Sequence, residues 1–195
     1  MLLNLRHPSP RRALHHLLPR RPVRDAKDLA PLPQHAEIVS TGQVAEKKSV
    51  FVGHAVRVKS VDEATLALQH ILTLKKVNKA SHNILAWRFS SPVAGSTTPL
   101  SGSDCNGEPP AGKNLLQLLE KLDVKDVLLV VTRWYGGVPM GPQRFQVINQ
   151  AGKEVLELDF GQLVAEFPVL YLLHKLPIRT FVAVSIMVWG IVVAC

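Results

Sequence analysis

Hydrophobic and polar positions in the middle of the chain change repeatedly between strand-like and helix-like patterns. An apolar, β-branched segment at Ser49–Val58 predicts a strand. Ser60 and Glu63 then have the spacing of a capping box, which marks the start of a helix. Apolar residues three and four positions apart continue this predicted helix to about Val77.

The second half of this region shows the same alternation. A second strand is predicted at His82–Phe89, and the Gly- and Pro-rich segment 90–112 is predicted to be a loop. Leucines are dense at Lys113–Leu122, which predicts a helix, and the continuous apolar run Asp126–Arg133 is typical of a central strand. A last helix is predicted from Pro142 to about Leu158.

Composition and charge separate this region from the two ends of the chain. The order of elements predicts one α+β or α/β domain over residues 37–160. The 195 residues include only two cysteines, which excludes a disulfide framework and a four-thiolate zinc site. The formal net charge is +8, but residues 37–160 hold 14 basic and 12 acidic residues. Most of the positive charge therefore lies outside the predicted domain.

The N-terminal segment 1–36 is predicted to be a basic, disordered leader. Its first 24 residues contain six arginines and no acidic residue, and prolines interrupt any long helix. A mitochondrial targeting segment and a loose basic extension both have this composition, and both interpretations stay open.

The C-terminal segment 161–195 is predicted to be an apolar tail. Residues 180–195 carry no charge and, as a helix, would reach about 24 Å, short of the roughly 30 Å of a bilayer core. A marginal membrane segment and a buried pair of strands are both consistent with this pattern.

Motifs of enzymes and metal sites are incomplete in this sequence. Gly107–Lys113 resembles a phosphate-binding loop, but Asn114 stands where magnesium needs Ser or Thr, and two prolines remove backbone donors. No pair of candidate ligands has the spacing of a metal site. The candidate ligands are His54, His82, Asp104, Cys105 and Glu108. We therefore predict no enzymatic activity, no cofactor and no metal.

The strongest constellation of functional residues lies at 133–144. Arg133 ends an apolar strand beside two aromatic residues and a glycine pair, and Arg144 falls in the first turn of the next helix. Glycines allow a partner to approach closely, and arginine binds anions through a forked donor. A tight turn with an internally paired arginine is the structural alternative, and both interpretations stay open.

At these residues the chain resembles the IMPACT family, over roughly residues 45–158. The resemblance is carried by Lys79–Arg88, Asp104–Glu108, Gly112–Gly137 and Gly141–Phe145. It implies an α+β fold of the ribosomal protein S5 domain 2-like type, a sandwich of a β-sheet and helices that is close to one domain of elongation factors. It also implies that no catalytic residues are present.

The family resemblance further implies a role in translation. Eukaryotic members resemble regulators that bind the large activator of the general-control initiation-factor-2 kinase, and resemblance to bacterial members implies nucleic-acid binding. The chain departs from the family at Asn106 and Gln143, where the family has aspartates, and we expect no RWD domain before the match.

We therefore predict a non-enzymatic, cytoplasmic protein that regulates translation or a stress response by binding a protein partner. An RNA- or ribosome-binding module is the alternative function. A mitochondrial location and a membrane-tethered form are the alternatives that the two ends suggest. The predicted partner-binding residues are His82, Asn83, Arg88, Asp104, Glu108, Arg133, Tyr135, Gly136, Gly137 and Arg144.

Overall fold

An antiparallel β-sheet forms the centre of the domain in this computed structural model, which describes residues 29–90 and 100–175. The strands are β1 (Ile38–Ser40), β2 (Val44–Glu46), β3 (Ser49–Arg57), β4 (His82–Phe89), β5 (Leu100–Asp104) and β6 (Val127–Trp134). Their order across the sheet is β1-β3-β6-β4-β5, and β2 pairs with the start of β3. The predictions for residues 1–28 and 176–195 lie outside the described residues.

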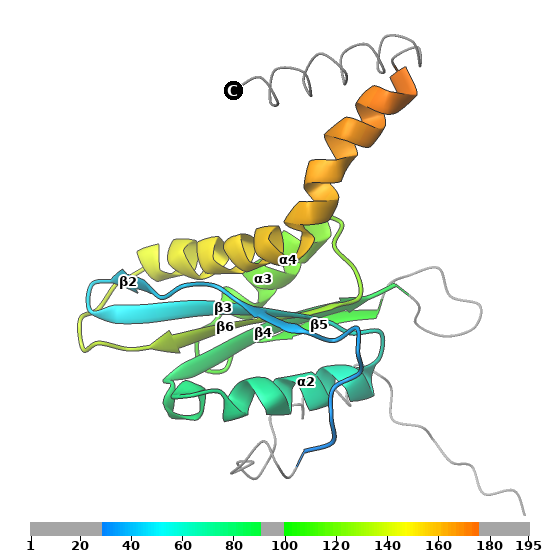
Figure 1. Cartoon of the computed structure of the whole chain (residues 1–195). Coiled ribbons are helices and arrows are strands. Elements are labelled where there is room, and N and C mark those ends of the chain that lie inside the picture. The colour runs from blue at the N-terminus through cyan, green and yellow to red at the C-terminus, as the bar shows by residue number, and fades with distance from the viewer. Residues whose placement is uncertain (1–28, 91–99, 176–195) are drawn as a thin grey trace, which may run out of the picture. The chain divides into compact units, whose positions relative to one another are not determined.

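Helices cover both faces of this sheet (Figure 1). Helix α2 (Val61–Thr73) packs on one face, and α3 (Ala111–Lys121) and the first half of α4 (Gln143–Lys175) pack on the other. The described residues up to Leu156 form one compact unit, and those from Glu157 belong to a second. The mixed arrangement confirms the predicted α+β class, with every strand pair in the described sheet antiparallel.

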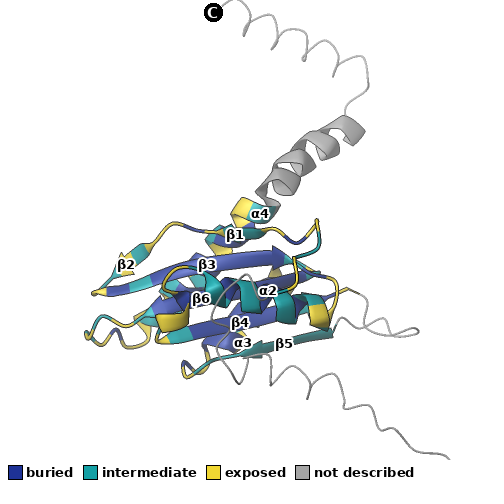
Figure 2. Cartoon of the chain, turned by 60° about the horizontal axis from the view of Figure 1, so that its bottom comes forward, coloured by how far each residue is buried: buried dark blue, intermediate teal, exposed yellow. Residues whose placement is uncertain are grey.

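The central position of β6 explains its sequence. This strand pairs with β3 on one side and β4 on the other, and its residues are buried except for the last, Trp134. A strand covered on both faces reads as a continuous apolar run, as predicted for this segment. Figure 2 shows the same burial continuing into β3 and β4. The core between the sheet and α2 includes Val56, Leu128 and Leu68.

The structure corrects four sequence-based predictions of secondary structure. One is the end of the last helix, since α4 continues past the predicted Leu158 to Lys175. The segment predicted as a single loop contains β5, an edge strand whose sequence, Leu-Ser-Gly-Ser-Asp, lacks an apolar alternation and pairs with β4. The short strands β1 and β2 were not predicted. Helix α2 ends at Thr73, before the predicted Val77, because Leu74 is extended and Lys76 adopts a positive φ of 72°.

The last residues of the predicted leader take part in the core. Ala36 is buried and Leu32 packs against the cluster under α2, so ordered packing begins before the predicted boundary at residue 37. Within the described ranges, no helix combines the length and apolar character needed to cross a membrane. The predicted apolar segment 180–195 is not among the residues described.

Candidate functional site

The antiparallel register gathers the main candidate residues at one end of the sheet. Strand β3 begins, β6 ends and β4 begins at this end, where Phe51 lies opposite Arg133 and Arg133 opposite His82. Directly opposite residues of an antiparallel pair point to the same face. His82 and Arg133 therefore lie side by side on the face that α3 and α4 cover.

Glu108 links three basic side chains at this end. Its carboxylate is buried, with 5% of the residue exposed. One oxygen, Oε1, accepts a hydrogen bond from Arg133 Nη1 and lies 3.3 Å from His82 Nε2. The other, Oε2, accepts from Arg144 Nε at 2.7 Å. One acidic group thus holds together residues from a loop, two strands and the start of α4.

The loop before Glu108 fixes the orientation of His82. His82 Nδ1 donates to the carbonyl oxygen of Asn106 at 2.8 Å, since a carbonyl can only accept. Gly107 has a φ of +86°, and a Cβ atom there would lie 3.1 Å from His82 Nδ1. This position therefore favours glycine for its backbone conformation and for the space beside the imidazole.

Two further residues of the predicted site, Asp104 and Asn83, form hydrogen bonds with the loop that leads to Glu108. Asp104 accepts a hydrogen bond from the Asn106 amide at 2.7 Å, and Asn106 Oδ1 accepts from the Asn83 amide at 3.0 Å. The Asn83 side chain is buried and accepts from Thr132 Oγ1 at 2.9 Å. Asn106 is thus an integral part of the loop.

Arg133 is buried between aromatic rings. Only 4% of the residue is exposed, and its guanidinium carbon lies 5.6 Å from the Phe51 ring centre and 5.5 Å from that of Tyr135. Its Nε is buried and has no hydrogen-bond partner among the described residues. A buried guanidinium needs both hydrogen bonds and compensating charge, which Glu108 supplies in part.

A pocket of about 440 Å³ opens above this ionic network. It is lined by His82, Gly107, Glu108, Arg133, Tyr135, Pro139, Met140, Gly141 and Arg144, and these nine residues are called the pocket below. Tyr135, with 47% of its surface exposed, is its most exposed large apolar side chain. The pocket is therefore an open depression over a buried floor of charge.

The structure brings together five of the predicted partner-binding residues in the pocket: His82, Glu108, Arg133, Tyr135 and Arg144. Gly137 lies in the loop between β6 and α4, where a Cβ atom would meet nothing within 4 Å among the described residues, whereas Gly136 packs against Lys48. Arg88 is separate from these residues. It stands near the other end of β4, where it donates to Asp123 Oδ1 at 2.9 Å and to the Val124 carbonyl at 3.2 Å.

Four residues of the pocket are not among the predicted partner-binding residues: Gly107, Pro139, Met140 and Gly141. All four lie within the family-like motifs or the loop between them, so proximity to those motifs was the available signal. The structure also shows that Glu108 is the acidic residue that pairs with Arg144. The amides of Arg144 and Phe145 donate to Gly141 and Pro142, so they serve the turn.

The described part of the chain contains no group of three or more His, Cys, Asp or Glu residues placed to hold a metal ion. Together, the fold and the site described above define a class of protein: a small α+β domain with an ionic network and an open pocket at one end of its sheet.

Comparison with known proteins gives this domain its family. The family model of the Impact N-terminal domain matches residues 47–156, more than half of the chain, and the chain therefore belongs to the IMPACT family. Protein IMPACT homolog of Schizosaccharomyces pombe is 38% identical over 59% of this chain and 40% of its own length. Protein IMPACT of Rattus norvegicus is 36% identical over 68% of this chain and 39% of its own length. The chain thus matches about two fifths of the length of these curated relatives.

Solved structures support the fold. A crystal structure of a hypothetical protein has a TM-score of 0.53 and 25% identity, covering 65% of this chain and 59% of that chain. A structure of the two-domain translational regulator Yih1 is 31% identical over 71% of this chain and 52% of that chain. Its TM-score of 0.43 is too low to add to the fold argument.

Proposed function

We propose that this IMPACT-family chain acts by binding a protein partner at the pocket and thereby regulates translation. The observation that carries the proposal is an open pocket whose floor holds two arginines and one buried glutamate. Arginine and tyrosine are the residue types that most often dominate protein interfaces. The pocket offers both, with Tyr135 exposed at its edge.

The chemistry of the pocket supports binding over catalysis. Two of the lining groups that could act as nucleophiles, Glu108 and His82, are engaged with each other and with the arginines in the ionic network. Glu108 accepts hydrogen bonds from the guanidinium groups of Arg133 and Arg144, and these bonds engage both of its carboxylate oxygens. The proposed role is therefore non-enzymatic.

The partner we propose is a component of the general-control kinase pathway, its large activator protein, as the family resemblance implies. The proposed location is the cytoplasm, where translation takes place. The alternatives of mitochondrial import and membrane tethering depend on residues outside the described ranges.

A charge reversal in the pocket tests this proposal. Arg144 is the better choice because its side chain is 28% exposed, whereas replacing Arg133 would remove the buried counter-charge of Glu108 and disturb folding. Affinity capture from a lysate should lose the specific partner with Arg144→Glu. Lys121→Glu, an equal charge change on the exposed surface of α3, should retain it. Equal recovery with both variants would contradict the proposal.

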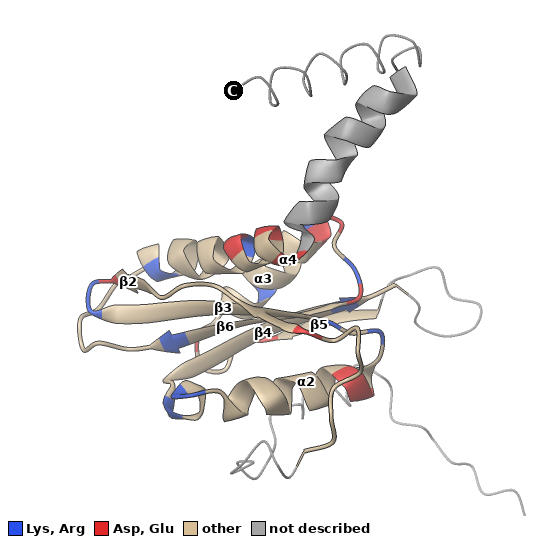
Figure 3. Ribbon diagram, viewed as in Figure 1, with Lys and Arg blue, Asp and Glu red and all other residues tan. Residues whose placement is uncertain are grey.

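A second candidate function is RNA binding, and a separate observation favours it. Five exposed lysines gather at the same end of the sheet: Lys47, Lys48, Lys75, Lys76 and Lys79, called the lysine group below. Figure 3 shows this concentration in the turn between β2 and β3 and in the segment after α2. Lysines that neutralise phosphates provide the salt-sensitive part of RNA affinity.

An aromatic residue accompanies the lysine group. Trp134 and Lys75 and Lys76 line a smaller pocket of about 220 Å³, together with Gln43 and Val50. Trp134 Nε1 donates to the Lys76 carbonyl at 3.1 Å, which fixes the indole beside the lysines. An aromatic ring next to phosphate-binding lysines is the arrangement that single-stranded RNA uses for stacking.

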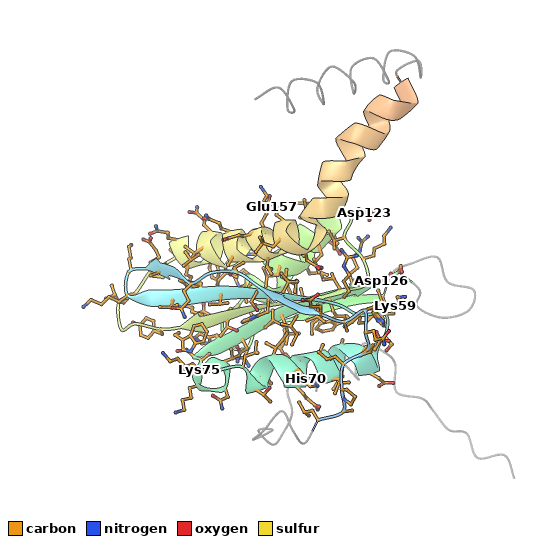
Figure 4. The ribbon with its side chains drawn as sticks, viewed as in Figure 1. Lys59, His70, Lys75, Asp123, Asp126 and Glu157 are labelled. Carbon is orange, nitrogen blue, oxygen red and sulfur yellow. The ribbon has the colours of Figure 1, made fainter. Side chains whose placement is uncertain are left out.

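Retention on RNA tests this second candidate. Binding should weaken steeply with salt, and Lys75→Gln with Lys76→Gln should reduce the salt dependence. The matched control is Lys59→Gln with Lys121→Gln, two exposed lysines away from the lysine group. Figure 4 shows Lys59 and Lys75 at opposite ends of the domain. Unchanged retention in the first pair would exclude the lysine group as the RNA-binding surface.

A further inference from the structure

The pocket carries one more fixed positive charge than negative charge. Arg133 and Arg144 both line it, and Glu108 is the one acidic residue among its described lining residues. Arg133 and Glu108 are almost fully buried, with 4% and 5% exposed. Because these two groups are buried beneath the opening, water screens the excess positive charge only in part, and the charge attracts a counter-charge. The electrostatic requirement of the pocket is therefore one additional negative charge.

The donors that would receive this charge come from the arginine side chains. Arg144 uses Nε for Glu108 and Nη1 for the Gly141 carbonyl, at 2.7 and 2.6 Å, and no described residue accepts a hydrogen bond from its Nη2. Arg133 provides an independent observation of a donor that lacks an acceptor, because its Nε is buried without a hydrogen-bond partner among the described residues. Guanidinium N–H groups are donors only, so the matching ligand must supply acceptor oxygens.

From these observations we propose that the pocket binds one carboxylate group of an acidic residue in the protein partner, with Arg144 as the contacting group. This inference rests on the proposed function, because it names the chemistry by which a protein partner is recognised. Glu108 and Arg133 are positioning residues in this account. They hold Arg144 and Tyr135 at the opening, where a carboxylate can reach them.

The charge balance favours a carboxylate over a phosphate. A carboxylate supplies the single negative charge that the pocket lacks, and its planar pair of oxygens matches the fork of a guanidinium. A doubly charged phosphate would exceed the positive excess, and its second charge would be repelled by the Glu108 carboxylate.

The loop between β6 and α4 leaves room for the partner's chain. Nothing among the described residues lies within 4 Å of the position that a Cβ atom would take at Gly137 or Gly141. Tyr135 stands at the same opening, half exposed. A partner backbone can therefore pass close to this loop while its acidic side chain enters the pocket.

Glu108 has two opposing effects on binding of the proposed carboxylate ligand. Its carboxylate stabilises both arginines but also repels the carboxylate of the partner. The Glu108→Gln substitution removes this negative charge. It should therefore strengthen binding of the carboxylate ligand, by about tenfold for a like charge several ångströms away. A purely structural ion pair predicts no gain of affinity from this change.

The test titrates N-acetyl-glutamate amide into the full chain and follows backbone amides by NMR. We expect saturable shifts at Tyr135, Gly137 and Gly141, and much smaller shifts with N-acetyl-glutamine amide or inorganic phosphate at equal ionic strength. Arg144→Gln should abolish the saturable shifts, Lys121→Gln should retain them, and Glu108→Gln should bind the probe about tenfold more tightly. The NMR spectrum of each variant reports whether it is folded.

Several results would overturn the inference. These are phosphate binding more tightly than the glutamate probe, a folded Glu108→Gln variant with no gain in affinity, or equal effects of Arg144→Gln and Lys121→Gln. If Glu108→Gln does not fold, the comparison of Arg144→Gln with Lys121→Gln decides. Absence of any binding of the probe would also overturn it. Loss of the partner with Arg144→Glu in the capture experiment would then leave the proposed function standing.

Discussion

His54 is an imidazole buried on the α2 face of the sheet. It lies in β3 opposite Ser40 and Val130, with 3% of the residue exposed. Its Nδ1 is 2.8 Å from Ser40 Oγ, and its Nε2 is buried without a partner among the described residues. Burial disfavours the charged ring and lowers the pKa of His54 from 6.5 to about 4.

We expect this histidine to make the stability of the fold depend on pH. Between pH 6.5 and 4 the unfolded chain binds a proton at His54 that the folded chain does not bind. The free energy of unfolding should therefore fall as the pH falls through this window, by up to about 3 kcal/mol. Urea denaturation of the wild type and His54→Gln at pH 7.5, 5.5 and 4.5 measures this contribution. The variant should show a smaller loss; equal losses in the two proteins would contradict the prediction.

Gly136 illustrates a glycine that serves packing, although the sequence suggested access for a partner. A Cβ atom at this position would lie 1.7 Å from the Lys48 carbonyl oxygen, because the end of β6 passes directly against the turn between β2 and β3. Neither backbone can yield by so much without moving the strands. The glycine is therefore required for the close approach of two segments of the same chain.

Gly136→Ala should reduce the free energy of unfolding by at least about 2 kcal/mol, the cost of forcing a methyl group into a closed site. Gly42→Ala is the matched control, since a Cβ atom there meets nothing within 4 Å among the described residues. That change should alter the free energy by less than about 0.5 kcal/mol. Urea denaturation of both variants gives the comparison, and a Gly136→Ala variant as stable as the control would refute this role.

At the scale of single residues, the sequence indicated most of the charged groups of the pocket but not their pairing. Arg133, Arg144 and Glu108 all lie in motifs that the sequence displays. Their association depends on the register of β6 with β4 and on the path of the loop after β5. Arg88 shows the limit clearly, because it shares a motif and a strand with His82 but lies beside Asp123.

At the scale of elements, the start of α2 shows how local chemistry fixes a helix end. Ser60 Oγ accepts a hydrogen bond from the Glu63 amide at 3.2 Å, as the capping-box spacing predicts. The Glu63 carboxylate accepts from the Lys59 amide at 2.8 Å, one residue earlier than in the usual reciprocal bond. This backbone hydrogen bond is the main reason that the pKa of Glu63 lies below its ordinary value.

Removing the cap should have a measurable and graded effect. Ser60→Ala should cost about 1 kcal/mol of unfolding free energy, whereas Ser60→Gly should cost only a few tenths of a kcal/mol. The difference arises because glycine tolerates the cap conformation and leaves the helix amides open to water. Urea denaturation at pH 7 measures both. A Ser60→Ala variant as stable as the wild type would show that the hydroxyl bond does not stabilise α2, and equal costs for the two variants would contradict the effect assigned to glycine.

The elements that the sequence predicted share a strong apolar pattern. β3, β4 and β6 are buried on both faces, and α2 and α3 have clear apolar faces. Burial therefore produces an apolar pattern that can be recognised in the sequence of these segments. Strand β5 has no such apolar pattern, because it is held by main-chain pairing to β4 and its residues are only partly buried. Backbone pairing at a sheet edge does not require a particular sequence pattern.

For the domain as a whole, the near-zero net charge does not show where the charged residues lie. Residues 37–160 are almost neutral, with 14 basic and 12 acidic residues. The antiparallel sheet nevertheless places the lysine group and the two pocket arginines at one end, while Asp123 and Asp126 lie at the other (Figure 4). A sum over the sequence cannot show this separation, since it arises from which strand ends meet.

The proposed function requires that a protein partner binds at the pocket. Site-specific photocrosslinking tests it most directly, with p-benzoyl-phenylalanine in place of Tyr135 in the full chain within living cells. Leu122 provides a matched control, because it is 46% exposed, against 47% for Tyr135, and lies at the C-terminal end of α3, away from the pocket. We predict a discrete, nuclease-resistant protein adduct from position 135 and none of that mass from position 122. Identical adducts from both positions, or no protein adduct from position 135, would contradict the proposed function.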